Sequence, residues 1–157
     1  RGKRHAGLID VDKPGLLPVS QYWEPVYRDA ADEIVLDPDE FYILASREAV
    51  TIPPTHAAEM VPFNPLVGEF RVHYAGFFDP GFGAIEAGGK GDDGKGGARA
   101  VLEVRSREVP FILEHGQIIG RLVYERLTDV PQTLYGAALN SNYQAQGLKL
   151  SKHFKQD

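Results

Sequence analysis

The chain of 157 residues contains no cysteine, one methionine and one tryptophan. Without cysteine it can form neither disulfides nor thiolate metal sites. It also lacks the Pro-Cys-x-x-Cys turn of the zinc-dependent nucleobase deaminases. No pair among its five histidines has the close spacing of metal ligands. The sequence therefore excludes chemistry that depends on a cysteine-held metal or on a disulfide framework.

No apolar run is long enough to cross a bilayer, and the first residues do not form a signal-peptide pattern. We therefore expect a cytoplasmic protein with no membrane partner.

The chain has fewer basic than acidic residues: 22 Asp and Glu residues outnumber 17 Lys and Arg residues and give a net charge of −5. General nucleic-acid binding relies on cationic contacts to phosphates, so this balance argues against it and leaves room for a small anion bound locally.

The size and composition are those of one globular domain, with 43% hydrophobic and 25% charged residues. Seventeen glycines and eleven prolines separate short runs rich in Val, Ile, Leu, Tyr and Phe, a pattern typical of short strands joined by turns. We expect a mainly β fold, of sandwich or distorted-barrel type, with very little helix. One short helix is expected at 54–60, with Thr55 as its cap. The expected strands are 7–11, 33–36, 41–45, 71–78, 99–105, 109–113 and 118–127.

The two ends and one internal segment differ from this pattern. The chain opens Arg-Gly-Lys-Arg-His without an initiator methionine. We interpret residues 1–6 as a linker or the start of a fragment, 7–147 as the β domain, and 148–157 as a C-terminal tail or lid. Six of the ten residues at 88–97 are glycine, which favours a mobile hairpin loop. A phosphate-binding loop is the weaker interpretation, because no Gly-Lys-Ser/Thr ending or following helix accompanies it.

The most informative motif is an aromatic strand that ends in the turn Asp79-Pro80-Gly81-Phe82, followed by a strand that carries Glu103. A carboxylate among aliphatic neighbours resists ionisation when it is buried, so Glu103 is either a well-paired structural acid or a proton-transfer group. Arg99 and Arg105 share its parity along the strand, so a solvent-facing position is a further alternative. Asp79 also has a structural alternative, because Asp before Pro-Gly is a common turn starter.

This arrangement resembles the dCTP deaminase branch of the dUTPase-like superfamily, in which a turn of the form A-x-x-x-D-P-G-[FW] precedes a [VIT]-L-E strand. Ala75 begins such a turn here, and Glu103 ends such a strand. The segment 116–122 is similar to the family's G-x-x-I-G-x-L turn and strand, and 143–147 is similar to its K-Y-x-x-Q-x-G tail. The four similarities occur in the family's order, and the chain looks like the C-terminal half of a two-domain member.

The resemblance implies a dUTPase-like distorted β-barrel or jelly roll that assembles as a trimer or pseudo-trimer, with sites at the subunit interfaces. It implies that Glu103 activates the water molecule that attacks C4 of the cytosine ring. Apolar neighbours on the strand are expected to exclude solvent around the Glu103 carboxylate. It also implies dCTP or dUTP as ligands, Mg²⁺ that arrives with the triphosphate, no zinc, and an N-terminal half of the same polypeptide as a partner. The residues that it assigns to substrate binding are Ala75, Asp79, Val101, Leu102, Tyr135 and Gln146.

The chain departs from the family pattern before the aromatic strand. Where the family has S-S-L-[GA]-R, whose Ser and Arg bind phosphate, this chain has Pro65 and Glu69, and Asn142 replaces a lysine of the tail. Each lost charge-assisted hydrogen bond costs about 1.5–3 kcal/mol of binding free energy. We therefore expect this segment by itself to bind dCTP weakly.

The expected function is hydrolytic deamination of dCTP to dUTP and ammonia. Three alternatives stay open on the sequence. The chain could be a non-catalytic half that completes a trimeric or pseudo-trimeric deaminase, a dUTP diphosphatase, or part of a bifunctional deaminase and diphosphatase.

Overall fold

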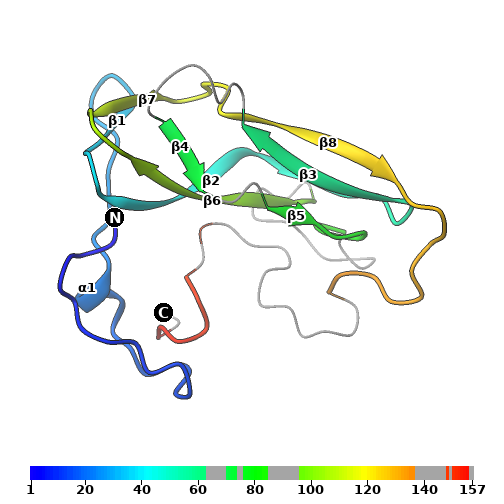
Figure 1. Cartoon of the computed structure of the whole chain (residues 1–157), viewed down its shortest axis with the longest axis horizontal. Coiled ribbons are helices and arrows are strands. Elements are labelled where there is room, and N and C mark those ends of the chain that lie inside the picture. Colours follow the sequence, from blue (N-terminus) through cyan, green and yellow to red (C-terminus); the bar gives the residue numbers. More distant parts are fainter. Residues whose placement is uncertain (63–69, 74–75, 85–95, 137–147, 149, 156–157) are drawn as a thin grey trace.

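The computed structural model describes residues 1–62, 70–73, 76–84, 96–136, 148 and 150–155. Within these ranges the chain forms eight strands and one four-residue helix, which confirms the prediction of a mainly β fold with very little helix (Figure 1). The strands pair antiparallel in three sheets, with the orders β1-β7, β2-β6-β4 and β5-β3-β8. The elements are α1 (Val19–Tyr22), β1 (Glu33–Leu36), β2 (Phe41–Val50), β3 (His56–Pro62), β4 (Phe70–His73), β5 (Phe77–Phe78), β6 (Ala98–Ser106), β7 (Phe111–Glu114) and β8 (Gly120–Arg126).

Strand β6 is the central strand of its sheet, and its sequence alternates between buried and more exposed positions. Alternate side chains of a strand point to opposite faces, so its even-numbered residues, Leu102 and Val104 among them, enter the core. Glu103 and Arg105 lie on the opposite face and are exposed. The buried core residues are Leu36, Tyr42, Ile52, Ala58, Met60, Phe78, Phe82, Ala98, Ala100, Leu102, Val104 and Leu113.

The prediction of a helix at 54–60 is wrong, because most of this segment lies in β3. β3 pairs with β8 along all seven of its residues and with β5 at Ala58 and Glu59. Ala58 and Met60 are both buried, a period of two that suits a strand. The Thr55 hydroxyl lies 2.9 Å from the His56 ring nitrogen Nδ1 instead of capping a helix. The described helix is α1, which sequence reasoning missed.

Other predicted strands were located with mixed accuracy. The strand at 33–36 matches β1, whereas the strand expected at 41–45 continues in β2 to Val50. The single strand expected at 71–78 is divided between β4 and β5, which belong to different sheets. Residues 7–11 do not form a strand. There the Leu8 carbonyl accepts a hydrogen bond from the Tyr22 hydroxyl, at 3.2 Å, and the Leu8 side chain is 95% exposed.

The β2–β6 pairing contains a bulge, because its register shifts between Ala45 and Ala49. The Arg99 guanidinium donates hydrogen bonds to the backbone carbonyls of Ser46 and Arg47. The Ser46 hydroxyl accepts a hydrogen bond from the Ala100 backbone N–H at 2.9 Å. These contacts satisfy backbone groups that a bulge leaves outside the regular ladder. Arg99 therefore has a structural role, although it shares the sequence parity of Glu103.

The N-terminal segment and the last described residues lie together on one side of the sheets (Figure 1). Leu17 and Phe154 form a parallel β-bridge. The Phe154 side chain is 3% exposed, and its ring packs against the rings of Tyr22 and Trp23 at centroid distances of 5.6 and 6.2 Å. We call this contact the terminal clasp. It connects residues 1–23 to the C-terminal segment 150–155.

Ion pairs add to the attachment of the N-terminal segment. The Arg1 guanidinium contacts the carboxylates of Glu24 at 2.7 Å and Asp37 at 3.0 Å. The hydrogen bond from Arg1 holds the pKa of Glu24 below its ordinary value. A hydrogen bond from Lys13 likewise lowers the pKa of Asp10. Among the described residues no helix has the length and apolar character needed to cross a bilayer.

Candidate active site

Glu103 lies near the middle of β6, on the face of the sheet that points away from the core. Its register partners are Ile43 on β2 and His73 on β4. The expectation that Leu102 and Val104 remove water around Glu103 is wrong, because both of these side chains project into the core on the opposite face. Glu103 is exposed in the single chain, so its carboxylate can contact an incoming ligand or a second protein surface.

The two residues before Glu103 have different surroundings. The Leu102 side chain is 1% exposed and belongs to the core. Only the backbone of Leu102 is therefore placed to contact a ligand on the outer face. Val101 is partly buried and alternates onto the same face as Glu103. Of the predicted binding pair, Val101 is the residue whose side chain lies beside the carboxylate.

The turn at 79–83 is fixed by backbone hydrogen bonds to the segment that follows β2. The Gly81 N–H donates to the Ile52 carbonyl at 3.1 Å, and the Ile52 N–H donates to the Phe82 carbonyl at 2.9 Å. Within the turn, the Phe82 N–H donates to the Asp79 carbonyl at 3.0 Å. The Asp79 side chain is exposed. The turn chemistry expected of Asp79 is therefore present, and its carboxylate faces solvent.

Tyr135 lies against the same turn. Its backbone N–H donates to the Pro80 carbonyl at 2.9 Å, and its ring packs on Phe82 at a centroid distance of 5.6 Å. Phe82 in turn packs edge-on against Phe78 at 5.0 Å. The structure thus brings Asp79 and Tyr135, which are 56 positions apart in the sequence, into one group beside the packed rings of Phe78 and Phe82.

Glu103 lies apart from this second group. The turn meets β6 at its first residue, since a Cβ on Gly83 would lie 2.8 Å from the Ala98 nitrogen. Five residues of strand separate Ala98 from Glu103, which is roughly 17 Å. The described residues therefore form two groups, one beside the first residue of β6 and the other at Glu103, near the middle of the strand. Ala75 and Gln146, together with Pro65, Glu69 and Asn142, lie outside the described residues.

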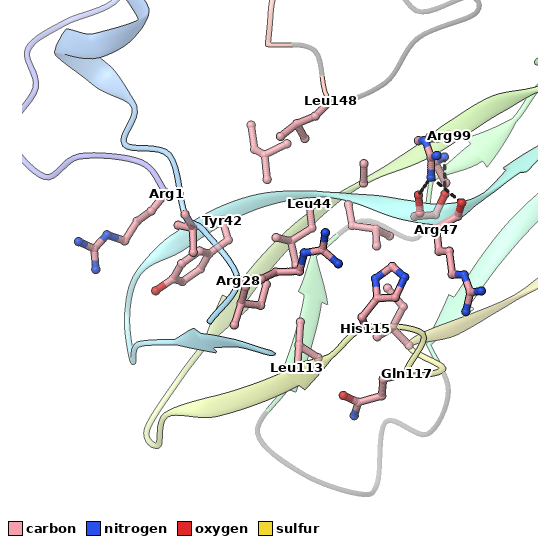
Figure 2. Close-up of a pocket in the computed structure, with 18 of the residues that line it drawn as sticks. Arg1, Arg28, Tyr42, Leu44, Arg47, Arg99, Leu113, His115, Gln117 and Leu148 are labelled. Atoms are coloured by element: carbon pink, nitrogen blue, oxygen red, sulfur yellow. Dashed lines mark hydrogen bonds between the residues drawn. The ribbon is translucent and has the colours of Figure 1, made fainter. Parts of the chain in front are cut away.

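A large cavity opens between β2, β7 and the N-terminal segment, with a volume of about 1460 Å³ (Figure 2). Its apolar lining includes Leu44 and Leu113, while Arg28 and Arg47 supply positive charge. Glu103 does not line it, so the cavity is distinct from the predicted catalytic residue. Sequence reasoning missed it, because its lining comes from distant segments that share no motif.

Within the described ranges, no three side chains among His, Asp and Glu come together in a way that could hold a metal ion. The described site therefore consists of a carboxylate on a strand face and an aromatic turn. This combination suits proton transfer and the stacking or hydrogen bonding of an organic ligand.

The sequence matches, over residues 1–154, the family described as 2'-deoxycytidine 5'-triphosphate deaminase (DCD), C-terminal domain. The chain belongs to this family. The chain is similar to the crystal structure of 2'-deoxycytidine 5'-triphosphate deaminase from Agrobacterium tumefaciens, with 62% sequence identity and a TM-score of 0.72. The match covers 83% of this chain and 37% of that chain. The resemblance stated from the motifs and the dUTPase-like β fold that it implied are both confirmed.

Two curated relatives of this chain are also named dCTP deaminases. The dCTP deaminase, dUMP-forming, of Beutenbergia cavernae is 30% identical over 122 residues, which cover 75% of this chain and 56% of the relative. The dCTP deaminase of Natronomonas pharaonis is 29% identical over 132 residues, which cover 82% of this chain and 60% of the relative. The chain thus spans somewhat more than half of the length of these relatives.

Proposed function

We propose that the full-length protein carrying this chain deaminates dCTP in the cytoplasm. Water adds to C4 of the cytosine ring, the C4–amino bond breaks, and the products are dUTP and ammonia. The family match supports the substrate. The observation that carries the proposal is Glu103, a carboxylate on the outer face of a central strand at the position that the family motif gives to its acid–base residue.

Glu103 would handle the two proton transfers that activate the water and release ammonia, and the remaining hydroxyl proton moves from O4 to N3 to give the uracil ring. As a carboxylate it takes a proton from the attacking water while the new C–O bond forms. As a carboxylic acid it then gives that proton to the departing amino group, which leaves as ammonia, and Glu103 returns to its starting state. Mg²⁺ would enter with the triphosphate as part of the substrate and take no part in the proton transfer.

We further propose that the site is shared between copies of the chain in a trimer or pseudo-trimer. Glu103 is exposed in a single chain, yet general acid–base chemistry benefits from a site closed to bulk water. The group formed by Asp79 and Tyr135 belongs to the turn that meets the first residue of β6, about 17 Å along the strand from Glu103. A neighbouring subunit would supply the missing wall and bring a second set of binding residues to Glu103.

The names of the relatives favour a second candidate for the product. The Beutenbergia relative is named dUMP-forming, whereas the Natronomonas relative is named dCTP deaminase without that addition. Forming dUMP from dCTP requires a second hydrolysis, in which water attacks phosphorus and pyrophosphate leaves. The bifunctional deaminase and diphosphatase therefore stays in the proposal beside the simple deaminase.

One assay separates these reactions. We expect the full-length protein, incubated with dCTP and Mg²⁺, to release one ammonia for each dCTP consumed. Ammonia can be measured enzymatically, and the nucleotides can be separated by anion-exchange chromatography. Accumulation of dUTP would identify a simple deaminase, and dUMP with pyrophosphate a bifunctional enzyme. Absence of ammonia would contradict the proposed function.

A further inference from the structure

Arg105 lies two residues beyond Glu103 on β6, on the same exposed face of the strand. Two residues of extended strand span about 7 Å, so the two charged residues are close neighbours along this face. The register partner of Arg105 on β2 is Phe41. The Arg105 guanidinium carbon lies over the Phe41 ring, 5.6 Å from its centroid. This cation–π contact gives an exposed arginine a defined position.

In the part of the chain that the structure describes, Arg105 forms no ion pair, although acidic residues outnumber basic ones 22 to 17. Guanidinium groups bind phosphate and carboxylate oxygens well, so an exposed arginine that forms no ion pair with the described residues can bind an anion.

An aromatic row supports the ring on which Arg105 rests. Phe41 packs against Trp23 at a centroid distance of 5.9 Å, and Trp23 packs against Phe154 of the terminal clasp at 6.2 Å. The Trp23 indole nitrogen is buried without a hydrogen-bond partner among the described residues. A buried unpaired donor costs free energy, so the contribution of Trp23 here comes from ring packing. The contact with Trp23 helps to hold the Phe41 ring in place.

We propose that Arg105 binds a phosphate oxygen of the nucleotide beside Glu103, with Phe41 holding the guanidinium in place. This assignment rests on the proposed function, which puts a nucleoside triphosphate at Glu103. It also supplies a cation in a chain where Glu69 stands at the position of the family's phosphate-binding arginine. Arg105 is thus a binding residue that acts on the charged part of the substrate, whereas Glu103 acts on the base.

The test uses inorganic tripolyphosphate as a probe, because its binding needs no catalysis. We expect Arg105→Gln to weaken tripolyphosphate binding to the full-length protein by about 10- to 100-fold, the loss of one charge-assisted contact. Calorimetric titration measures this affinity. Arg107→Gln, a change at another exposed arginine just after β6, is the matched control and should leave the affinity unchanged. Phe41→Leu should weaken binding as well, because it removes the supporting ring.

A second ligand checks the assigned role. Deoxycytidine carries no phosphate, so its affinity should be the same for Arg105→Gln and the parent protein. Three results would overturn the assignment: no tripolyphosphate binding by the parent, equal binding by Arg105→Gln, or a loss of assembly on size-exclusion chromatography without a loss of tripolyphosphate affinity. A parent protein that binds tripolyphosphate through Arg105 but releases no ammonia from dCTP would contradict the proposed function and leave the anion site intact.

Discussion

Replacing Glu103 with Gln is expected to abolish ammonia release from dCTP while the protein stays folded. The amide cannot take a proton from water or return one to the leaving amino group. Groups of this kind contribute about 10²–10⁴-fold to rate, and here one carboxylate serves two transfers. The loss should therefore be at least several hundredfold. Because Glu103 is exposed on the outer face of β6, the change leaves the core packing untouched.

The Glu103→Gln experiment needs a measure of folding and a matched control. Glu125 is also an exposed strand glutamate, on β8, so Glu125→Gln removes the same charge without touching β6. That variant should keep full activity. Circular dichroism and thermal denaturation should be the same for both variants and the parent. If ammonia release persists in Glu103→Gln, the active carboxylate belongs to another part of the polypeptide.

Among the described glycines, replacing Gly83 with Ala should cause the largest loss of stability. Gly83 has a φ of +70°, and a Cβ there would lie 2.1 Å from the Val50 carbonyl oxygen and 2.8 Å from the Ala98 nitrogen. Both are backbone atoms at the β2–β6 pair, where Val50 and Ala98 are register partners, so neither can move freely. Strain and overpacking of this kind cost about 2–5 kcal/mol of unfolding free energy.

Gly15 provides the control for the backbone angle. Its φ of +73° is nearly the same, but an added Cβ would meet no atom within 4 Å. Gly15→Ala should therefore show only the left-handed backbone penalty, about 1–2 kcal/mol. Thermal denaturation should place Gly83→Ala roughly 5–15 °C below the parent and clearly below Gly15→Ala. Equal melting temperatures for the two variants would show that the contact with Val50 is relieved by backbone movement.

Short-range patterns predicted the strands in which apolar and charged residues alternate. β6 is the clearest case, because Leu102 and Val104 alternate with Glu103 and Arg105 and the structure buries one set and exposes the other. The segment at 54–60 was wrongly predicted as a helix, because a threonine before a run of small residues resembles a helix start. Its conformation is decided by pairing with β8, which lies more than 60 residues away, and no local pattern contains that information.

The sequence predicted individual residues of the candidate site but not their arrangement in space. The motifs identified Glu103 and the turn at Asp79, and the hydrogen bond between Tyr135 and Pro80 joins two of the predicted positions. The shared parity of Glu103 and Arg105 left a solvent-facing position as one alternative, and the sequence did not decide between it and a buried position. It also did not show the terminal clasp, because contacts between Phe154 and Trp23 depend on how the two ends of the chain fold back.

Trp23 gives the terminal clasp a spectroscopic signal of its own. It is the single tryptophan of the chain, and it lies between Phe41 and Phe154. In a preparation of this chain, intrinsic fluorescence excited at the indole therefore reports on one junction, where the C-terminal segment, the N-terminal segment and the edge of β2 meet. A shift of its emission towards longer wavelength would mark the release of this junction, separately from the unfolding of the sheets followed by circular dichroism.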